Sequence, residues 1–272
     1  MVAAALDHPG LRLTAAELIA LRPAFRPARH RPAGARPGAI PARVAGQGMD
    51  LREIRAFAEG DDQRRIDPGA TARTGQLHVR SFHEDRDDTR LLIVDFRHQM
   101  LWGTGSALRS VRAARWLARI GWQAVAQGAS VALMAVKEGA PALLPQMLAL
   151  SQTMAQAHDA ALALGSGQSS LATALVQARR MVPPGGQVHL ATGPDGLAGA
   201  DAALSQLARG RVIRVHVILD PAETSPPRTA LSVRHGHAAR HGRLSPLDCG
   251  ALLAHLHSLG AKARAVSPDD TG

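Results

Sequence analysis

Short apolar runs alternate with amphipathic stretches along the chain from residue 91 onward. The runs are rich in branched side chains and have the length of strands that are buried on both faces. Buried strands are therefore expected at 91–95, 130–136, 187–191, 212–219 and 262–266. Between them, apolar residues recur at three- and four-residue steps, which is typical of helices that cover a sheet. Helices are expected at 106–127, 143–157, 169–181, 201–208 and 245–258.

This alternation predicts an α/β fold with a Rossmann-like, doubly wound and mainly parallel sheet. Ligand sites in such folds lie at the carboxyl ends of the strands, and Asp95 ends the first expected strand. In the helix expected at 106–127, the apolar positions predict the face that packs on the sheet. Four arginines fall outside that stripe: Arg109, Arg112, Arg115 and Arg119.

The N-terminal part of the chain has a different pattern. Residues 14–21 predict a short helix capped by Thr14. Residues 22–43 contain five prolines and six arginines with no acidic residue, which predicts an extended and exposed arm. This arm is either a solvated linker on the domain surface or a basic contact for nucleic acid or anionic lipid. We divide the chain into an N-terminal extension at 1–45, a charged segment at 46–90 and the α/β domain at 91–272.

Composition narrows the classes of function. Lys plus Arg number 32 against 22 Asp plus Glu, which gives a formal net charge of +10. Aromatic residues make up only 3% of the chain, so the stacking platforms of single-strand and RNA readers are scarce. The charge alone is therefore weak support for contact with a polyanion. Nucleic acid is a possible partner that the composition does not favour.

Neither disulfides nor a zinc cluster are expected. The single cysteine, Cys249, excludes an intrachain disulfide and every cysteine-based zinc cluster, and it is expected to be a small core residue. The spacing of His235, His237 and His241 suits a hairpin or loop, with no carboxylate or second thiol nearby to complete a metal shell. No apolar run reaches the roughly 18 to 20 residues of a membrane span. We expect a soluble, cytoplasmic chain.

Motifs for catalysis are missing from the sequence. There is no G-K-S/T loop and no G-x-S-x-G, and the glycines at 103 and 105 lack the third glycine of a dinucleotide fingerprint. Asp61 and Asp62 are adjacent and surrounded by arginines, which keeps both carboxylates ionised and unsuited to acid/base work. The sequence therefore predicts a non-enzymatic protein without a cofactor or a resident metal.

The segment 52–80, REIRAFAEGDDQRRIDPGATARTGQLHVR, resembles the signature of a bacterial family of von Willebrand factor A-like proteins, the domain of unknown function family fifty-eight. Residues 57 and 68 depart from that pattern. The matching polar and glycine positions include Arg52, Glu53, Gly60, Asp61, Asp62, Arg64, Asp67, Thr71 and Arg73. The carboxylates of residues 59, 61 and 62 are expected either to face the arginines at 64, 65 and 73 and fix a turn, or to form a docking surface for a partner.

The resemblance also implies a site. Von Willebrand A domains bind a divalent cation through D-x-S-x-S at the end of the first strand, where this chain has Asp95, Arg97 and Gln99. A further ligand position would fall at Ser169, and the last near Gly193. Because arginine and glutamine replace both serines, this resembles a degenerate metal-ion-dependent adhesion site. Arg97 is expected to pair with Asp95 and supply the positive charge; the alternative is that Arg97 points to solvent.

Members of the resembled family are associated with MoxR-type AAA+ ATPases. The resemblance thus implies an adaptor that acts through protein contacts, with such an ATPase as its partner in assembly or remodelling. The alternative class is a binder of nucleic acid or anionic surfaces that uses the arm at 22–43. A metal-dependent hydrolase is a third possibility, for which the sequence offers no matching set of residues.

Overall fold

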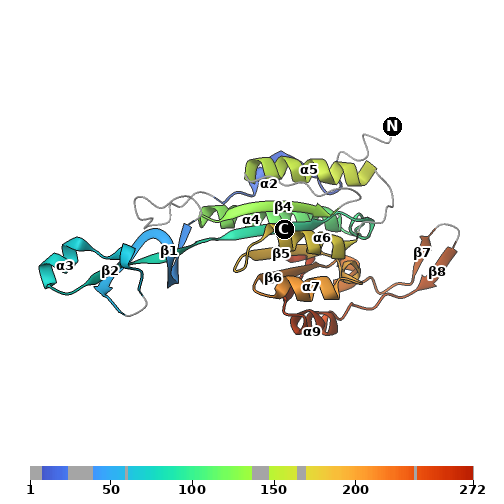
Figure 1. The fold of residues 1–272 in the computed structure, drawn as a ribbon. Coiled ribbons are helices and arrows are strands. Elements are labelled where there is room, and N and C mark those ends of the chain that lie inside the picture. Colours follow the sequence, from blue (N-terminus) through green and yellow to red (C-terminus); the bar gives the residue numbers. More distant parts are fainter. Residues whose placement is uncertain are drawn as a thin grey trace.

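In this computed structural model, the structure describes residues 8–23, 39–58, 61–136, 147–163, 170–235 and 238–271. At its centre is a parallel sheet of five strands in the order β4-β3-β5-β6-β9 (Figure 1). The strands are β3 (Thr89–Asp95), β4 (Ser130–Val136), β5 (Gln187–Thr192), β6 (Val212–Ile218) and β9 (Lys262–Val266). The predicted doubly wound α/β fold is confirmed, and every expected strand is present.

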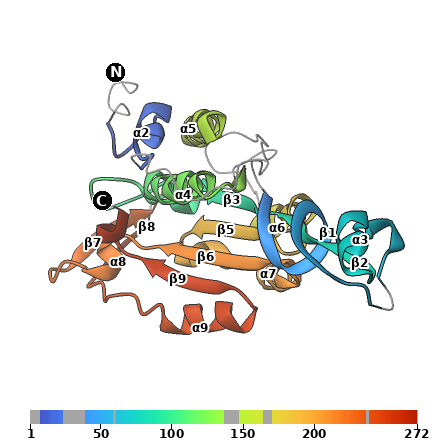
Figure 2. The same ribbon diagram turned by 90° about the vertical axis from the view of Figure 1, so that its left-hand side faces the viewer.

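Helices lie on both faces of this sheet, which explains the near-continuous apolar character of β3 and β4 (Figure 2). Leu92 and Val94 point to one face, and Leu91 and Ile93 point to the other. The first face packs against α4 (Arg109–Ala126) and α5 (Met147–Ala163), and α2 (Ala15–Ala20) packs on these two helices. The second packs against α6 (Leu171–Met181), α7 (Asp201–Ala208) and α9 (Gly250–Ser258). No helix in the described residues is long and apolar enough to cross a membrane.

Two antiparallel hairpins project from this body (Figure 1). The larger pairs β1 (Ala39–Ala56) with β2 (His78–Asp87) and holds η1 (Gln63–Arg65) and α3 (Pro68–Thr74) between its strands. The smaller pairs β7 (Leu231–His235) with β8 (Ala238–Gly242), as the histidine spacing predicts. Of the predicted arm, residues 24–38 lie outside the described residues, and 39–43 form the start of β1.

Short helical turns complete the connections. They are η2 (His98–Met100), η3 (Pro194–Leu197), α8 (Pro221–Thr224) and η4 (Pro268–Thr271). Two of the longer helices begin later than the sequence predicts. Helix α4 begins at Arg109 because the Leu108 N–H donates to the Gly10 carbonyl and holds residue 108 extended. Helix α9 begins at Gly250, whose N–H donates to the Asp248 carboxylate, so the chain turns there and not at residue 245.

A buried histidine makes the stability of this core depend on pH. The His158 ring is fully buried, lies edge-on to Phe96 and is 2.9 Å from Ser110 Oγ through Nε2. Burial lowers the pKa of His158 from 6.5 to about 4. The unfolded chain therefore binds more protons between pH 6.5 and 4, and stability falls as pH falls through that window.

We expect this one group to cost about 3 kcal/mol of unfolding free energy between pH 7 and pH 4. The variant His158→Met removes that contribution. Urea denaturation of both proteins across this pH range should give a shallower pH dependence for the variant. Identical slopes for the two proteins would contradict the assignment to His158.

Candidate functional site

Asp95 and Arg97 form a two-pronged ion pair at the carboxyl end of β3. Arg97 Nε is 2.9 Å from Asp95 Oδ1, and Nη2 is 2.6 Å from Oδ2. The Asp95 side chain is fully buried, and that of Arg97 is 11% exposed. This fork-to-carboxylate geometry fixes both side chains. The predicted pair is present, and the alternative that Arg97 points to solvent is wrong.

Neighbouring elements complete the bonding of this pair. Thr192, at the end of β5, donates its hydroxyl to Asp95 Oδ2 at 2.6 Å, and Arg97 Nη2 donates to the Gly196 carbonyl at 2.6 Å. A Cβ at Gly196 would lie 2.1 Å from Thr192 Oγ1, so only glycine allows this approach. The Gln99 amide oxygen, turned toward the guanidinium, lies 3.1 Å from Arg97 Nη2. Ser169 lies outside the described residues.

The residues around Asp95 do not fit a resident divalent cation. The Asp95 carboxylate and the Gly196 carbonyl, which would otherwise be oxygen ligands, both accept bonds from the Arg97 guanidinium. A cation in this position would have to displace a guanidinium that donates to both Asp95 oxygens, the Gly196 carbonyl and the Gln99 amide oxygen. Among the described residues, no group of three His, Cys, Asp or Glu side chains is placed to hold a metal ion.

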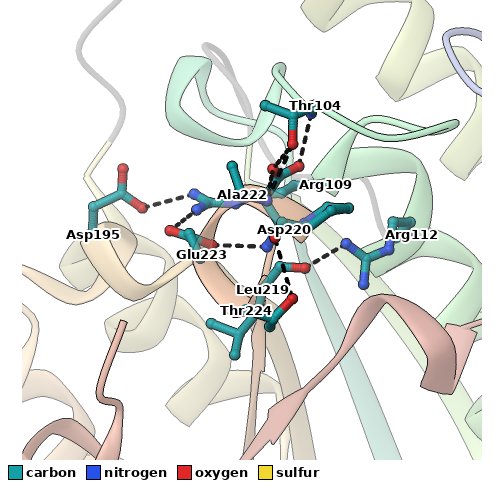
Figure 3. A network of polar contacts seen from close by, with 10 residues as sticks. Thr104, Arg109, Arg112, Asp195, Leu219, Asp220, Ala222, Glu223 and Thr224 are labelled. Atoms are coloured by element: carbon teal, nitrogen blue, oxygen red, sulfur yellow. Dashed lines mark hydrogen bonds and ion pairs between the residues drawn. The ribbon is translucent and has the colours of Figure 1, made fainter. Parts of the chain in front are cut away.

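A second polar network lies at the same end of the sheet, beyond β6 (Figure 3). Asp220 is fully buried and accepts hydrogen bonds from the Thr104 N–H at 3.0 Å, the Thr104 hydroxyl and the Ala222 N–H at 3.0 Å. Glu223 accepts from the Asp220 N–H at 2.8 Å, which completes a capping box for α8. The loop after β6 is thereby tied to the loop before α4.

The positively charged groups of this network are the guanidinium groups of Arg109 and Arg112. Arg109 is 1% exposed, pairs with Glu223 and lies 3.3 Å from Asp195 Oδ1. Arg112 is 5% exposed and donates to the Leu219 carbonyl. Burial lowers the pKa of Arg112 from its usual value, and the nearby Asp220 opposes that shift.

The sequence prediction for these two arginines was therefore wrong, because it placed them outside the buried stripe of the helix. The first turns of α4 lie against the carboxyl edge of the sheet, where buried carbonyls and carboxylates need donors. One signal in the sequence could have found the acceptors. Asp220 and Glu223 have the D-x-x-E spacing of a helix start directly after an apolar strand.

The charged signature segment mainly stabilises its own hairpin. Asp67 caps α3 by accepting the Ala70 N–H at 2.7 Å, and its other oxygen pairs with Arg80 at 2.6 Å. These two bonds lower the pKa of Asp67, with the Ala70 N–H as the larger cause. Thr71 accepts the His78 N–H at 3.1 Å and links α3 to β2.

The expected pairing of Asp61 and Asp62 with the arginines at 64, 65 and 73 is corrected by the structure. Asp61 pairs with Arg55 at 2.6 Å, because β1 ends beside this turn, and that bond lowers the pKa of Asp61. Asp62 accepts the Arg64 N–H at 3.0 Å and caps η1. The exposed Arg73 donates to the Gly69 carbonyl. Gly60 and the side chains of Arg52 and Glu53 lie outside the described part of the chain.

Comparison with known proteins gives one family and a few distant similarities. The family model described as protein of unknown function DUF58 matches residues 53–234. Over 61 residues the chain is 39% identical to uncharacterized protein Rv1480 of Mycobacterium tuberculosis and to uncharacterized protein Mb1516 of Mycobacterium bovis. That match covers 22% of this chain and 19% of each relative, so the chain spans about a fifth of their length.

Two solved structures have a similar arrangement of elements. One is the conserved hypothetical protein BatB from Bacteroides thetaiotaomicron, with 12% identity and a TM-score of 0.47. The other is an aerotolerance-related membrane protein from Bacteroides fragilis, with 13% identity and a TM-score of 0.45. Each similarity covers 67% of this chain and 93% of the other.

Proposed function

Because this chain belongs to the DUF58 family, we propose that it is a von Willebrand factor A-like interaction module with a degenerate metal-ion-dependent adhesion site. The observation that carries the proposal is the Arg97–Asp95 pair at the carboxyl end of β3. The guanidinium takes the place that the fold would give to a cation. The module then recognises its partner without a metal and without catalysing a reaction.

The surroundings of the pair support a binding role over a catalytic one. Asp95 and Asp220 are both buried, and fixed donors bond to the oxygens of both carboxylates, so neither is placed to contact a substrate. Such a bonded edge is a rigid platform. Its exposed rim includes Trp102, which is 37% exposed and lies under the Arg109 guanidinium at 4.1 Å, and Asp195, whose side chain is 57% exposed. Tryptophan is enriched among the residues that dominate protein interfaces.

The partner we propose is a MoxR-type AAA+ ATPase in the cytoplasm, as the family resemblance implies. The test uses the full chain, treated with EDTA and desalted, and the purified MoxR-type ATPase of the same organism. Interferometry with ATP present should detect binding at both low and high salt. Trp102→Ser should weaken it about tenfold or more. The matched control is Val176→Ser on α6, a 46% exposed apolar residue on another surface, which should leave binding unchanged.

Three results would contradict this proposal. The first is no binding to the ATPase. The second is binding only after magnesium has been added back to the EDTA-treated chain, and the third is an equal effect of Trp102→Ser and Val176→Ser. Binding that disappears at high salt and requires nucleic acid would instead favour the arm at 22–43 as the functional element, because charge-only contacts are screened by salt.

A further inference from the structure

One face of the sheet carries a polar stripe that a doubly wound fold does not require. On β5, β6 and β9, the residues that point to the α4 side include His189, Arg214, His216 and Arg264. Their neighbours on the opposite face are apolar and belong to the core with α6, α7 and α9. Helix α4 lies over β3 and β5, and β6 and β9 extend the sheet beyond it (Figure 2). Polar side chains therefore lie where a second helix would otherwise bury apolar ones.

The stripe forms one wall of a cavity of about 480 Å³, and α4 forms the other. Four arginines line the cavity: Arg90, Arg119, Arg214 and Arg264. None of the described residues that line it is acidic. Asp88 accepts from Arg90 Nη2 at 2.7 Å, and Asp270 is close enough to Arg264 for that arginine to help lower the pKa of Asp270. Arg214 has no hydrogen-bonded or ion-paired partner among the described residues. Four arginines against these two carboxylates leave an excess of positive charge among the groups named here.

Two imidazoles form the floor of this cavity. His189 is 6% exposed and His216 is 5% exposed. The planes of the two rings differ by 5°, and His189 Nδ1 lies 3.2 Å from His216 Nε2. The outer nitrogens, His189 Nε2 and His216 Nδ1, are buried and have no partner. Whichever ring donates the shared proton, a neutral pair presents one unused N–H and one unused acceptor. Buried polar atoms without partners are rare, so these two need an explanation.

Trp116 adds a further donor to the same wall. Its ring centroid is 5.8 Å from that of His216, and the Arg264 guanidinium lies 4.5 Å from the ring. The Trp116 indole N–H is buried without a partner. Indole nitrogen can only donate, so its missing partner is an acceptor. Guanidinium groups around an open cavity, with unpartnered donors buried in its wall, are the features expected of a site for an anion.

We propose that this cavity binds a small organic phosphate. Guanidinium groups match the oxygens of a phosphate in two-pronged contacts, and the imidazole and indole N–H groups supply further donors. The volume lies within the range of small-molecule sites. The site is independent of the function proposed above, because the Asp95 pair lies at the carboxyl ends of the strands and this cavity extends to Gln127, at the opposite end of α4.

The titration of the two imidazoles gives this site a signature. Burial, together with Arg214 and Arg90, lowers the pKa of His189 to about 4. Burial also lowers the pKa of His216, to about 3, with further contributions from His189, Arg264 and Arg214. Asp88 is the opposing carboxylate. A bound phosphate reverses part of this field and favours protonation of the pair. Binding should therefore raise the pKa values of the two rings, and uptake of protons by the rings should accompany binding at mildly acidic pH.

The experiment is calorimetric titration of the full chain with AMP, pyrophosphate and inorganic phosphate, in two buffers of different ionisation enthalpy. We expect binding of AMP, the organic phosphate of the three, with proton uptake. Arg214→Gln and Arg264→Gln should each weaken it tenfold or more. Arg209→Gln, an equal change of charge at the exposed end of α7, should have no such effect. Arg264 is itself exposed, so that variant tests the site without risk to the core.

Comparison of AMP with pyrophosphate and inorganic phosphate then separates a nucleoside-bearing ligand from a simple phosphate. The proposal is overturned if AMP does not bind, or if Arg209→Gln weakens binding as much as Arg214→Gln. Binding of pyrophosphate or inorganic phosphate alone would also overturn it, because neither is an organic phosphate.

Discussion

Replacing Asp95 by alanine is expected to lower the free energy of unfolding by about 3 to 5 kcal/mol. The substitution leaves the Arg97 guanidinium, 11% exposed, with neither of the carboxylate oxygens that it now contacts at 2.6 and 2.9 Å. An uncompensated charge in a site of this burial is far more costly than the loss of an exposed ion pair. Urea denaturation at pH 7 measures the change.

A double-mutant cycle separates the interaction energy of Asp95 with Arg97 from the contributions of their other neighbours. Asp95→Ala combined with Arg97→Met removes both charges, so the double variant should be more stable than Asp95→Ala alone. Arg97→Met alone should also destabilise the protein, because Asp95 keeps only the Thr192 hydroxyl and the residue-97 N–H as donors. If the single Asp95 variant and the double variant unfold at the same urea concentration, the charge of Arg97 is not held by Asp95.

Asp220→Ala is expected to have a similar cost, about 3 to 5 kcal/mol. It removes the acceptor for the Thr104 N–H and hydroxyl and for the Ala222 N–H, and it deprives Arg112 of the carboxylate that most favours its charged form. The loops that precede α4 and follow β6 would then lose their connection. Denaturation at neutral pH, with circular dichroism to verify the fold, is the measurement.

The matched control for this variant is Asp195→Ala. Asp195 also belongs to the network and lies 3.3 Å from Arg109, but its side chain is 57% exposed. Exposed ion pairs contribute little, so we expect a loss below about 1 kcal/mol. Equal losses for Asp195→Ala and Asp220→Ala would show that burial does not determine the strength of this network.

The sheet could be predicted from the sequence because its strands are short apolar runs separated by helical periodicity. The pair of Asp95 and Arg97 could be predicted because both residues lie in one short segment. Thr192 and Gly196 escaped prediction, since they meet Asp95 only after β5 docks beside β3. A periodicity count treats each helix alone, which is why it placed Arg109 on the wrong surface.

The cavity shows a different limit of sequence reasoning. Arg214 and His216 alternate with apolar residues in β6, a pattern unlike the continuous apolar run of a strand covered on both faces. The alternation in the sequence therefore predicts a strand with one polar face. The other residues of the cavity could not be predicted from this pattern. Trp116 lies in a helix about 100 residues earlier, and Arg264 lies in the last strand.

The guanidinium at the end of β3 is joined to the chain by covalent bonds, whereas a metal ion is in equilibrium with solution. Its charge therefore cannot be lost by dilution, by chelators or by a change in the supply of divalent ions. A surface built around it contains this side chain from the moment the chain folds. Any control of its interactions has to act on the partner, on the amount of protein or on another part of the fold, and only a change in the gene can remove the charge.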